Sequence, residues 1–490
     1  MTACRTGLAG IAVGLVCFLT VAVLGPSAEE PALPGSGPPF AFAAHPSPYL
    51  VIGLVVLGAV TGAAGLGLCL YGLGRDGRLP GRALLIAGLL ATAAFALTPP
   101  VGSSDHLNYM AYGRMYVLGH SPYTTTAQDL PHDPVIRAVQ EWPDTPSVYG
   151  PLVTAQQAFA SWVGGDSVRL TVFVLSVTNA LAFALAGLLI HRMGGGARGT
   201  LLFLLNPLML FHLVSGAHND ALGIAAAVAA LTVFARGAPA LGRTVATGAL
   251  TGVAVVVKLP AALVGGGPAW VLVHRLWKTR ERRFAGLLAA LFGTAGVIAL
   301  GAYSWVGFDA LGPVREAAKM ISLASPWHLL HGPLVVLPRP VLQICALLLM
   351  VGLIWLLARS LPATSDESAR TAAILVLAWL FSTLYILPWY DGLGWAVLAL
   401  PGFAVAGWAR IQWVLLAHTL ALTLAYLPAR SADVIGLPGG LRWLQSTLRP
   451  QIMPWVLVAV LAALVWTCLR RRPPRPAPAP GATPPAAAEP

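Results

Sequence analysis

The segment SSDHLNYMAYGRMYVLGHSPY (103–123) places one acid, two histidines and four tyrosines directly after an apolar run. Serines before Asp105 and a glycine after Leu118 predict a helix over roughly 104–118. A carboxylate at the start of this helix can serve as a general base toward a hydroxyl group, or can simply cap the helix. The tyrosine rings can stack on a sugar or lipid headgroup, or form an interfacial aromatic belt. One face of the helix carries Asp105, Tyr109, Tyr112 and Tyr116.

A second polar cluster lies in NPLMLFHLVSGAHNDALGIAAA (206–227), between two apolar runs. His218, Asn219 and Asp220 fall in the very tight turn that joins these runs. Polar residues at such a boundary favour a binding role, because they are costly inside a membrane. Asp220 alone can instead cap the helix that follows.

A lone lysine, Lys258, stands in the apolar stretch VAVVVKLPAALV (253–264). A charge in such surroundings is costly unless it meets an anion or water. The proline two residues later breaks the helix and frees backbone groups nearby. Lys258 is therefore predicted to hold a phosphate at the membrane boundary, and the alternative is a lysine that snorkels to water.

Three further segments combine aromatic rings with acids or histidines: YSWVGFD (303–309), ASPWHLLHG (324–332) and LPWYDGLGW (387–395). Each can be an aromatic belt alone. Their convergence on one face indicates a carbohydrate site instead, since aromatic faces stack on sugar rings and acids accept hydrogen bonds from hydroxyls. The last two segments supply Trp327, His328, Trp389, Tyr390 and Asp391 as candidates.

Membrane helices must position these residues. The chain of 490 residues is 57% hydrophobic and only 10% charged, and its mean hydropathy is +0.76, which predicts an all-α polytopic membrane protein. About fourteen apolar runs have the length of a membrane span. They cover residues 7–25, 49–73, 82–98, 168–190, 199–215, 220–235, 244–257, 259–274, 284–304, 334–358, 371–389, 393–409, 411–428 and 452–469.

The distribution of charge predicts the orientation. With the N-terminus inside, the cytoplasmic side holds 20 of the 30 Lys and Arg and 5 of the 18 Asp and Glu. The net charge of +12 therefore reflects topology, and no nucleic-acid partner is expected. Amphipathic helices are expected in the first long external loop, with the apolar side of the helix after Ser104 in the membrane interface. The external loops are 26–48, 99–167, 305–333 and 429–451.

Over nearly its whole length the chain resembles the GT-C class of membrane glycosyltransferases. It resembles most closely the actinobacterial polyprenyl-phosphate-mannose-dependent α-1,6-mannosyltransferases. The NP…GAHND pattern is the most specific part of this resemblance. The segments that carry it are 103–123, PSVYGPL (146–152), NPLMLFHLVSGAHNDAL (206–222), VVVKLPAAL (255–263) and LPWYDGLGWAVLALP (387–401).

The resemblance implies a GT-C-like bundle in the cytoplasmic membrane that moves mannose, with inversion, from polyprenyl-phosphate mannose to a mannan or lipid-linked mannoside acceptor. It implies α-1,6 linkages made on the outer face. Asp105 matches the first-loop acid of the class and is the expected base, and Lys258 is the expected phosphate partner. No cofactor is expected, and divalent metal use stays open because no second acid adjoins Asp105. The expected substrate-binding residues are His106, Tyr109, Tyr112, Tyr149, His218, Asn219, Asp220, Trp327, His328, Trp389, Tyr390 and Asp391.

Two other functions stay open: a transporter or flippase of a lipid-linked sugar, and a related enzyme using another polyprenyl-phosphate sugar or a protein acceptor. A transporter would need polar residues through the bilayer or paired interrupted helices, and the sequence has no clear repeat. One catalytic domain is expected over 1–470, with a disordered Pro/Ala-rich tail over 471–490. The first span is expected to be retained rather than cleaved near residue 28. The five cysteines lack CxxC spacing and predict neither disulfides nor a zinc site.

Overall fold

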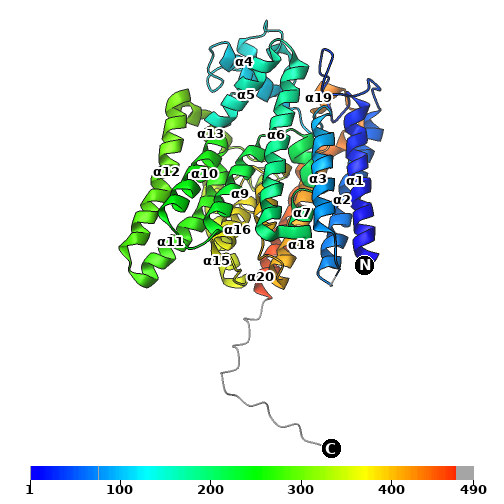
Figure 1. Cartoon of the computed structure of the whole chain (residues 1–490). Helices are drawn as coiled ribbons and strands as arrows, with labels where there is room; N and C mark the ends of the chain where they lie inside the picture. Colours follow the sequence, from blue (N-terminus) through cyan, green and yellow to red (C-terminus); the bar gives the residue numbers. More distant parts are fainter. Residues whose placement is uncertain (1, 76, 471–490) are drawn as a thin grey trace, which may run out of the picture.

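The computed structural model describes residues 2–75 and 77–470, and the regular elements in these ranges are helices (Figure 1). This confirms the prediction of an all-α membrane protein. The predicted tail, 471–490, lies outside the described residues. The α-helices are α1 (Thr2–Leu24), α2 (Pro48–Leu73), α3 (Gly81–Ala96), α4 (Asp105–Val117), α5 (Pro151–Gly164), α6 (Val168–Ile190), α7 (Gly196–Leu202), α8 (Pro207–Met209), α9 (Asp220–Ala235), α10 (Leu241–Val257), α11 (Gly266–Thr279), α12 (Arg282–Val306), α13 (Leu311–Ala317), α14 (Pro326–Leu329), α15 (Arg339–Ser360), α16 (Glu367–Leu380), α17 (Asp391–Leu398), α18 (Ala406–Ala425), α19 (Ala432–Ile435) and α20 (Met453–Leu469). Short 3-10 and π segments are η1 (Ala127–Asp129), η2 (Ile136–Ala138), η3 (His191–Gly195), η4 (Leu210–Ser215), η5 (Leu259–Gly265), η6 (Phe308–Ala310), η7 (Pro388–Tyr390), η8 (Gly439–Leu441) and η9 (Leu444–Ile452).

Among the described residues, six helices are long and apolar enough to cross a membrane, and a seventh span results if one bent pair is counted. That pair, Pro207–Ser215 with Asp220–Ala235, is bent by 118°. Shorter apolar helices, α3 and α10, add to the bundle. The chain is therefore a multi-pass membrane protein, but the expected count of about fourteen spans is not confirmed. The six long spans are Thr2–Leu24, Pro48–Leu73, Val168–Leu202, Arg282–Val306, Arg339–Ser360 and Gly439–Leu469.

Prolines lie at three of the breaks between helices, and one of them, Pro207, divides the run 199–215 that was expected to be a single helix. Pro207 follows an irregular turn and starts α8, whose first backbone N–H groups are accepted by Asn206. Pro388 separates α16 from α17, and Pro260 follows the end of α10. Proline lacks the backbone N–H that a helix interior needs, so each break exposes polar backbone inside the bundle. Such breaks are tolerated where they line a cavity or are enclosed by protein.

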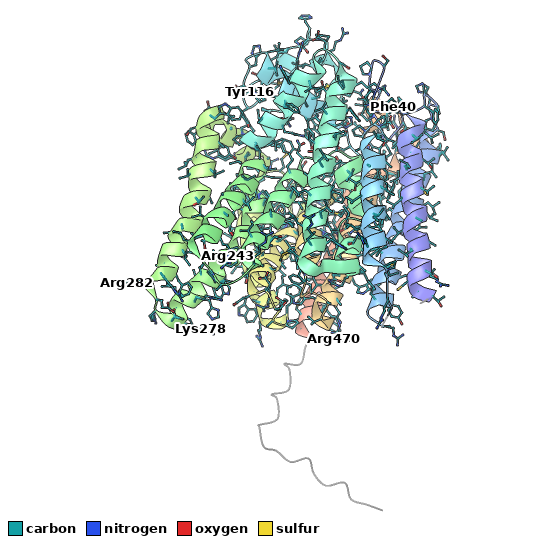
Figure 2. All side chains as sticks on the ribbon, viewed as in Figure 1. Phe40, Tyr116, Arg243, Lys278, Arg282 and Arg470 are labelled. Carbon is teal, nitrogen blue, oxygen red and sulfur yellow. The ribbon has the colours of Figure 1, made fainter. Side chains whose placement is uncertain are left out.

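Four labelled basic residues mark one end of the bundle, which we call the basic end. Figure 2 shows Arg243, Lys278, Arg282 and Arg470 at one end and Tyr116 at the opposite end. The start of α1 and the end of α20 lie at the basic end, whereas α4, α5 and α19 lie at the Tyr116 end (Figure 1). Segments predicted to form long external loops therefore share one end of the molecule.

The helix predicted over 104–118 is present as α4, but its surroundings differ from the expected ones. Leu107 and Met110, which were expected to face the membrane interface, are fully buried, and Tyr109 is only 1% exposed. α5 packs against α4 and carries exposed apolar side chains, among them Phe159 and Trp162. The physical reason is that α5, α6 and η2 cover α4, so protein replaces lipid around it.

Candidate active site

A cavity of about 510 Å³ opens beside α4 and brings together residues from distant parts of the chain. We call it the large cavity. Four parts of the chain supply most of its walls. They are α4, the segment that follows η2, the break after α10 and the break before α17. It contains six of the residues singled out in the sequence: Asp105, Tyr109, Tyr112, Tyr149, Lys258 and Tyr390.

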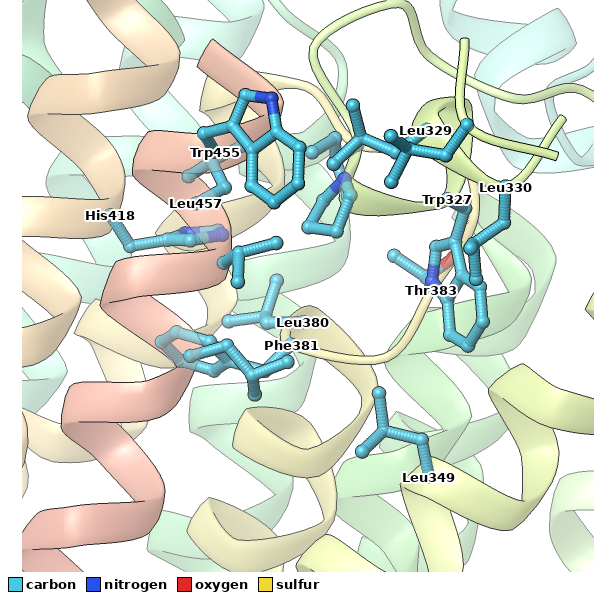
Figure 3. Close-up of a pocket in the computed structure, with 15 residues that line it drawn as sticks. Trp327, Leu329, Leu330, Leu349, Leu380, Phe381, Thr383, His418, Trp455 and Leu457 are labelled. Carbon is cyan, nitrogen blue, oxygen red and sulfur yellow. The ribbon is translucent and has the colours of Figure 1, made fainter. Parts of the chain in front are cut away.

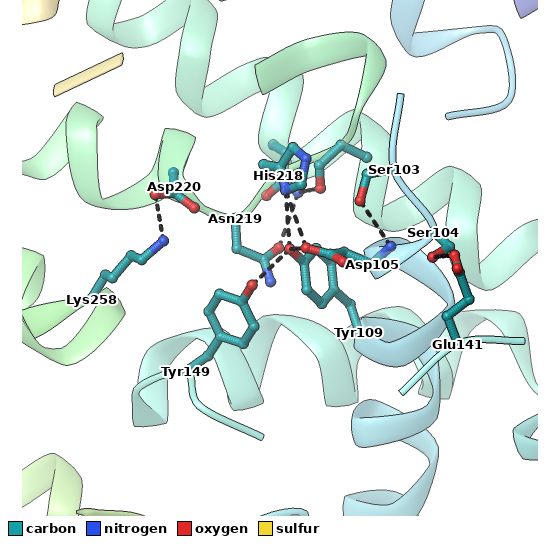
Figure 4. Close-up of polar contacts among 12 residues, drawn as sticks. Ser103, Ser104, Asp105, Tyr109, Glu141, Tyr149, His218, Asn219, Asp220 and Lys258 are labelled. Atoms are coloured by element: carbon teal, nitrogen blue, oxygen red, sulfur yellow. Dashed lines mark hydrogen bonds and ion pairs between the residues drawn. The ribbon is translucent and has the colours of Figure 1, made fainter. Parts of the chain in front are cut away.

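Asp105 is the first residue of α4, and the residues before it hold it in place (Figure 4). The Ser103 hydroxyl oxygen accepts the Asp105 backbone N–H at 3.1 Å. Ser104 occupies the cap position, but its hydroxyl donates to the carboxylate of Glu141 rather than capping the helix. Asp105 therefore is not the cap, and its side chain is left to interact with the site.

Tyr109 lies one helical turn after Asp105 and connects it to two other predicted site residues. The Tyr109 hydroxyl donates to Asp105 Oδ2 at 3.3 Å and lies 2.8 Å from the Tyr149 hydroxyl. His218 Nδ1 lies 3.1 Å from the same hydroxyl and 3.8 Å from Asp105 Oδ2. The His218 ring stacks on Trp389 with centroids 3.6 Å apart. A hydrogen-bonded chain thus fixes the carboxylate from one side.

A close backbone contact brings Tyr149 into this network. The Gly150 N–H donates to the Val257 carbonyl at 3.1 Å, directly before Lys258. A Cβ added at Gly150 would lie 2.2 Å from the Val256 carbonyl oxygen, so only glycine allows the approach. The PSVYGPL segment therefore docks on the end of α10 and places Tyr149 beside Lys258.

Lys258 has an extended backbone between α10 and η5, and its side chain is 19% exposed. Its ammonium lies 2.7 Å from Asp220 Oδ1 and 4.0 Å from the centroid of the Tyr390 ring. Asp220 is the first residue of α9, whose cap position is Asn219, so the carboxylate pairs with Lys258 rather than capping the helix. An ammonium has three donors, and the remaining ones are free to contact an anion in the cavity.

Burial raises the pKa of Asp105 to about 6, because enclosure by protein disfavours the charged form. Hydrogen bonds from Ser103 and Tyr109 and the charge of Lys258 oppose this rise, and Glu141 adds to it. The side chain nevertheless remains 21% exposed, since it faces cavities rather than packed side chains. At pH 7 the group is mainly ionised, and a pKa near neutrality suits a general base.

Several predicted site residues lie outside the large cavity. His106 is fully buried and does not line the large cavity. Asn219 accepts a hydrogen bond from Asn179 at 3.1 Å in the turn before α9. Asp391 is fully buried, accepts the Thr419 hydroxyl at 2.7 Å and lies 2.9 Å from His418 Nδ1.

Trp327 and His328 belong to α14, away from Asp105. Trp327 donates its indole N–H to the Ser382 carbonyl at 2.9 Å and lines a separate apolar pocket of about 290 Å³. Figure 3 shows this pocket, with Trp327 and Trp455 on its walls. His328 is half-buried and lines neither space. The structure therefore does not bring these two residues to the carboxylate.

The sequence interpretation missed a second space that adjoins Asp105, a cavity of about 280 Å³ that we call the polar cavity. The predicted external loops 99–167 and 429–451 supply most of its polar side chains, so the high polarity of these two loops was the available signal. Its lining includes Asp105, Glu141, Trp142, Tyr385, Ser431, Gln445 and Arg449.

Glu141 is thus a second acid in a cavity that Asp105 also lines, although 36 residues separate the two in the sequence. Within residues 2–75 and 77–470, no three His, Cys, Asp or Glu side chains are grouped as they would need to be to hold a metal ion.

Residues 5–274 match the family described as alpha-(1->6)-mannopyranosyltransferase, N-terminal domain. The chain is 29% identical over 199 residues to alpha-(1->6)-mannopyranosyltransferase A of Corynebacterium glutamicum, covering 40% of this chain and 38% of that protein. It is 29% identical over 335 residues to alpha-(1->6)-mannopyranosyltransferase A of Mycobacterium tuberculosis, covering 63% of each. The matched part therefore spans less than two thirds of either relative.

Among solved structures, the crystal structure of ArnT from Cupriavidus metallidurans bound to undecaprenyl phosphate aligns with a TM-score of 0.44 at 14% identity. The alignment covers 79% of this chain and 77% of that chain. The family match includes the segments around Asp105, His218 and Lys258. Since that match covers more than half of its length, this chain belongs to the alpha-(1->6)-mannopyranosyltransferase family.

Proposed function

We propose that this chain transfers mannose from polyprenyl-phosphate mannose to a mannan or lipid-linked mannoside acceptor and forms an α-1,6 linkage. The family membership supports mannose transfer. The observation that carries the mechanism is that Asp105 and Lys258, a base and a cation, line the same cavity although 153 residues separate them in the sequence.

In this reaction a hydroxyl of the acceptor attacks the anomeric carbon of the mannose. The new oxygen–carbon bond forms on the face opposite the phosphate, the carbon–oxygen bond to the phosphate breaks, and a β-linked donor thus becomes an α-linked product. The attacking hydroxyl gives its proton to the Asp105 carboxylate, which is mainly ionised at pH 7 because its pKa is about 6. The departing polyprenyl phosphate keeps the electron pair, and its charge is stabilised by Lys258.

The neighbours of these two residues support the assigned roles. Tyr109 donates to Oδ2 of the Asp105 carboxylate, and His218 lies beside the same oxygen, so both residues hold the carboxylate from one side. Asp220 and Tyr390 hold the Lys258 ammonium inside the cavity. The remaining wall is largely apolar, with Leu263 and Met320 among its residues, as a lipid-borne donor requires.

The orientation we propose places the cavities outside the cytoplasmic membrane. Arg243, Lys278, Arg282 and Arg470 lie at the opposite end of the bundle (Figure 2), and basic residues beside membrane spans favour the cytoplasmic side. A lipid-linked donor also fits an enzyme that works where sugar nucleotides are absent.

The test is an incubation of purified protein in lipid with radiolabelled polyprenyl-phosphate mannose and a short α-1,6-mannan, followed by linkage analysis of the product. The expected product is the acceptor extended by one α-1,6-linked mannose. Transfer from another polyprenyl-phosphate sugar with no transfer of mannose would disprove the proposed donor. Movement of the intact donor across vesicles without any glycosidic bond would identify a transporter.

A further inference from the structure

Two cavities of different character meet at Asp105. The large cavity approaches the carboxylate from the side of Lys258, and the polar cavity approaches it from the side of Arg449. Both are lined by Asp105, Trp142 and Tyr385. A group in either space can therefore reach the carboxylate, and the two spaces can hold different ligands at the same time.

The polar cavity offers both hydrogen-bond donors and acceptors. Glu141 accepts the Ser431 backbone N–H at 2.6 Å and the Ser104 hydroxyl, and each carboxylate oxygen retains a further acceptor site. Arg449 donates its Nε and Nη2 to the backbone carbonyls of residues 425, 426 and 428, and no described residue accepts from Nη1. Paired donors and acceptors of this kind match the hydroxyl groups of a sugar.

The backbone at Trp142 supports a binding role. Trp142 has a φ of +58°, in the left-handed region that is costly for a bulky residue, and it is 57% exposed and lines both cavities. A strained backbone that presents a large aromatic ring to a cavity points to function, because packing gains nothing from the exposed ring. Aromatic faces of this kind stack on sugar rings.

We propose that the polar cavity binds the terminal hexose of the acceptor, with Trp142 against the sugar ring and Glu141 and Arg449 on its hydroxyls. This inference rests on the proposed function and adds the location of the acceptor. At about 280 Å³ the space falls below the ~300 Å³ lower limit of typical drug-sized pockets, so it suits a single sugar ring and not a lipid chain. From this cavity the acceptor hydroxyl reaches Asp105 on one side while the donor occupies the large cavity on the other.

The test introduces a bulky side chain into each cavity in turn. Ser431 lines only the polar cavity and Ala318 lines only the large cavity, and both are exposed, so a larger side chain at either position is compatible with folding. Ser431→Trp should raise the KM for a soluble α-1,6-mannobioside by about tenfold or more and leave the KM for the donor unchanged. The matched variant Ala318→Trp should raise the KM for the donor instead.

A second variant keeps the shape of the polar cavity. Glu141→Gln should weaken mannobioside binding, measured by calorimetry without donor, by about tenfold, because a charged acceptor is replaced by a neutral one. If the wild-type protein transfers mannose but Ser431→Trp leaves the mannobioside KM unchanged, or raises the donor KM instead, the proposed location of the acceptor is wrong. A wild-type protein that transfers no mannose would overturn the proposed function and this inference with it.

Discussion

Replacing Asp105 by asparagine should abolish transfer and at the same time stabilise the protein. The amide keeps the shape of the side chain and can still accept the hydrogen bond that Tyr109 donates to Oδ2 at 3.3 Å. It cannot take up a proton from the acceptor hydroxyl. A positioned general base contributes about 10² to 10⁴ in rate, so the turnover should fall by that factor.

The stability gain follows from the pKa of Asp105, which is about 6 in the folded protein against a usual 3.8. The folded state holds the proton more tightly than the unfolded state does, so the ionised carboxylate costs the folded protein roughly 3 kcal/mol at pH 7. This cost is absent at low pH and develops between about pH 4 and pH 6. Asparagine carries no charge, so Asp105→Asn should unfold at a higher temperature at pH 7 and at nearly the wild-type temperature at pH 4.

The assay measures transfer from radiolabelled donor and thermal unfolding in detergent at both pH values. Asp144→Asn is the matched control, since it makes the same substitution at an exposed acid of the same loop that lines neither cavity. The control should keep both the activity and the unfolding temperature of the wild type. Transfer at near wild-type rate by Asp105→Asn would refute the assignment of the base, and a lower unfolding temperature at pH 7 would refute the account of its burial.

Three further predictions concern the cation, the pH dependence and the topology. Lys258→Ala should lower kcat/KM for the donor by roughly 10²-fold. Adding Asp220→Asn should remove the unpaired buried carboxylate that this change leaves, without restoring transfer. Transfer by the double variant would show that the lysine is structural. Because Asp105 must be ionised and its pKa is about 6, log kcat/KM should fall with unit slope below about pH 6, and a flat profile down to pH 4.5 would exclude it as the base. Cysteine at exposed Thr124 should react with an impermeant reagent in intact cells while cysteine at Lys278 should not, and the reverse labelling would invert the topology.

The sequence alone was sufficient for the properties that depend on local composition. The length and apolarity of its runs predicted an all-helical membrane protein, and the helix from Asp105 to Val117 followed from its flanking serines and glycine. The same reasoning misjudged the continuity of the run 199–215, because Pro207 breaks a helix that hydropathy treats as one.

The sequence also identified residues of the large cavity, because polar groups in so apolar a chain are rare and costly. It could not show that Lys258 and Asp220 form an ion pair. A snorkelling lysine and an aspartate that caps a helix would fit the same local sequence pattern. The 2.7 Å contact between them joins positions 38 residues apart and exists only after α9 and α10 pack.

Tertiary structure alone decided which aromatic and acidic residues adjoin Asp105. Trp389 stacks on His218 near the site, whereas Asp391, two residues later, turns into a buried contact with His418. Glu141 lines the polar cavity because the loop before α5 folds back onto Ser104. Neighbours in the sequence can thus face different surroundings, because the direction of a side chain depends on the local backbone turn and on the elements that happen to cover it. The order of residue types does not specify the local backbone turn or the covering elements. Packing in the tertiary structure therefore decides which distant groups pair.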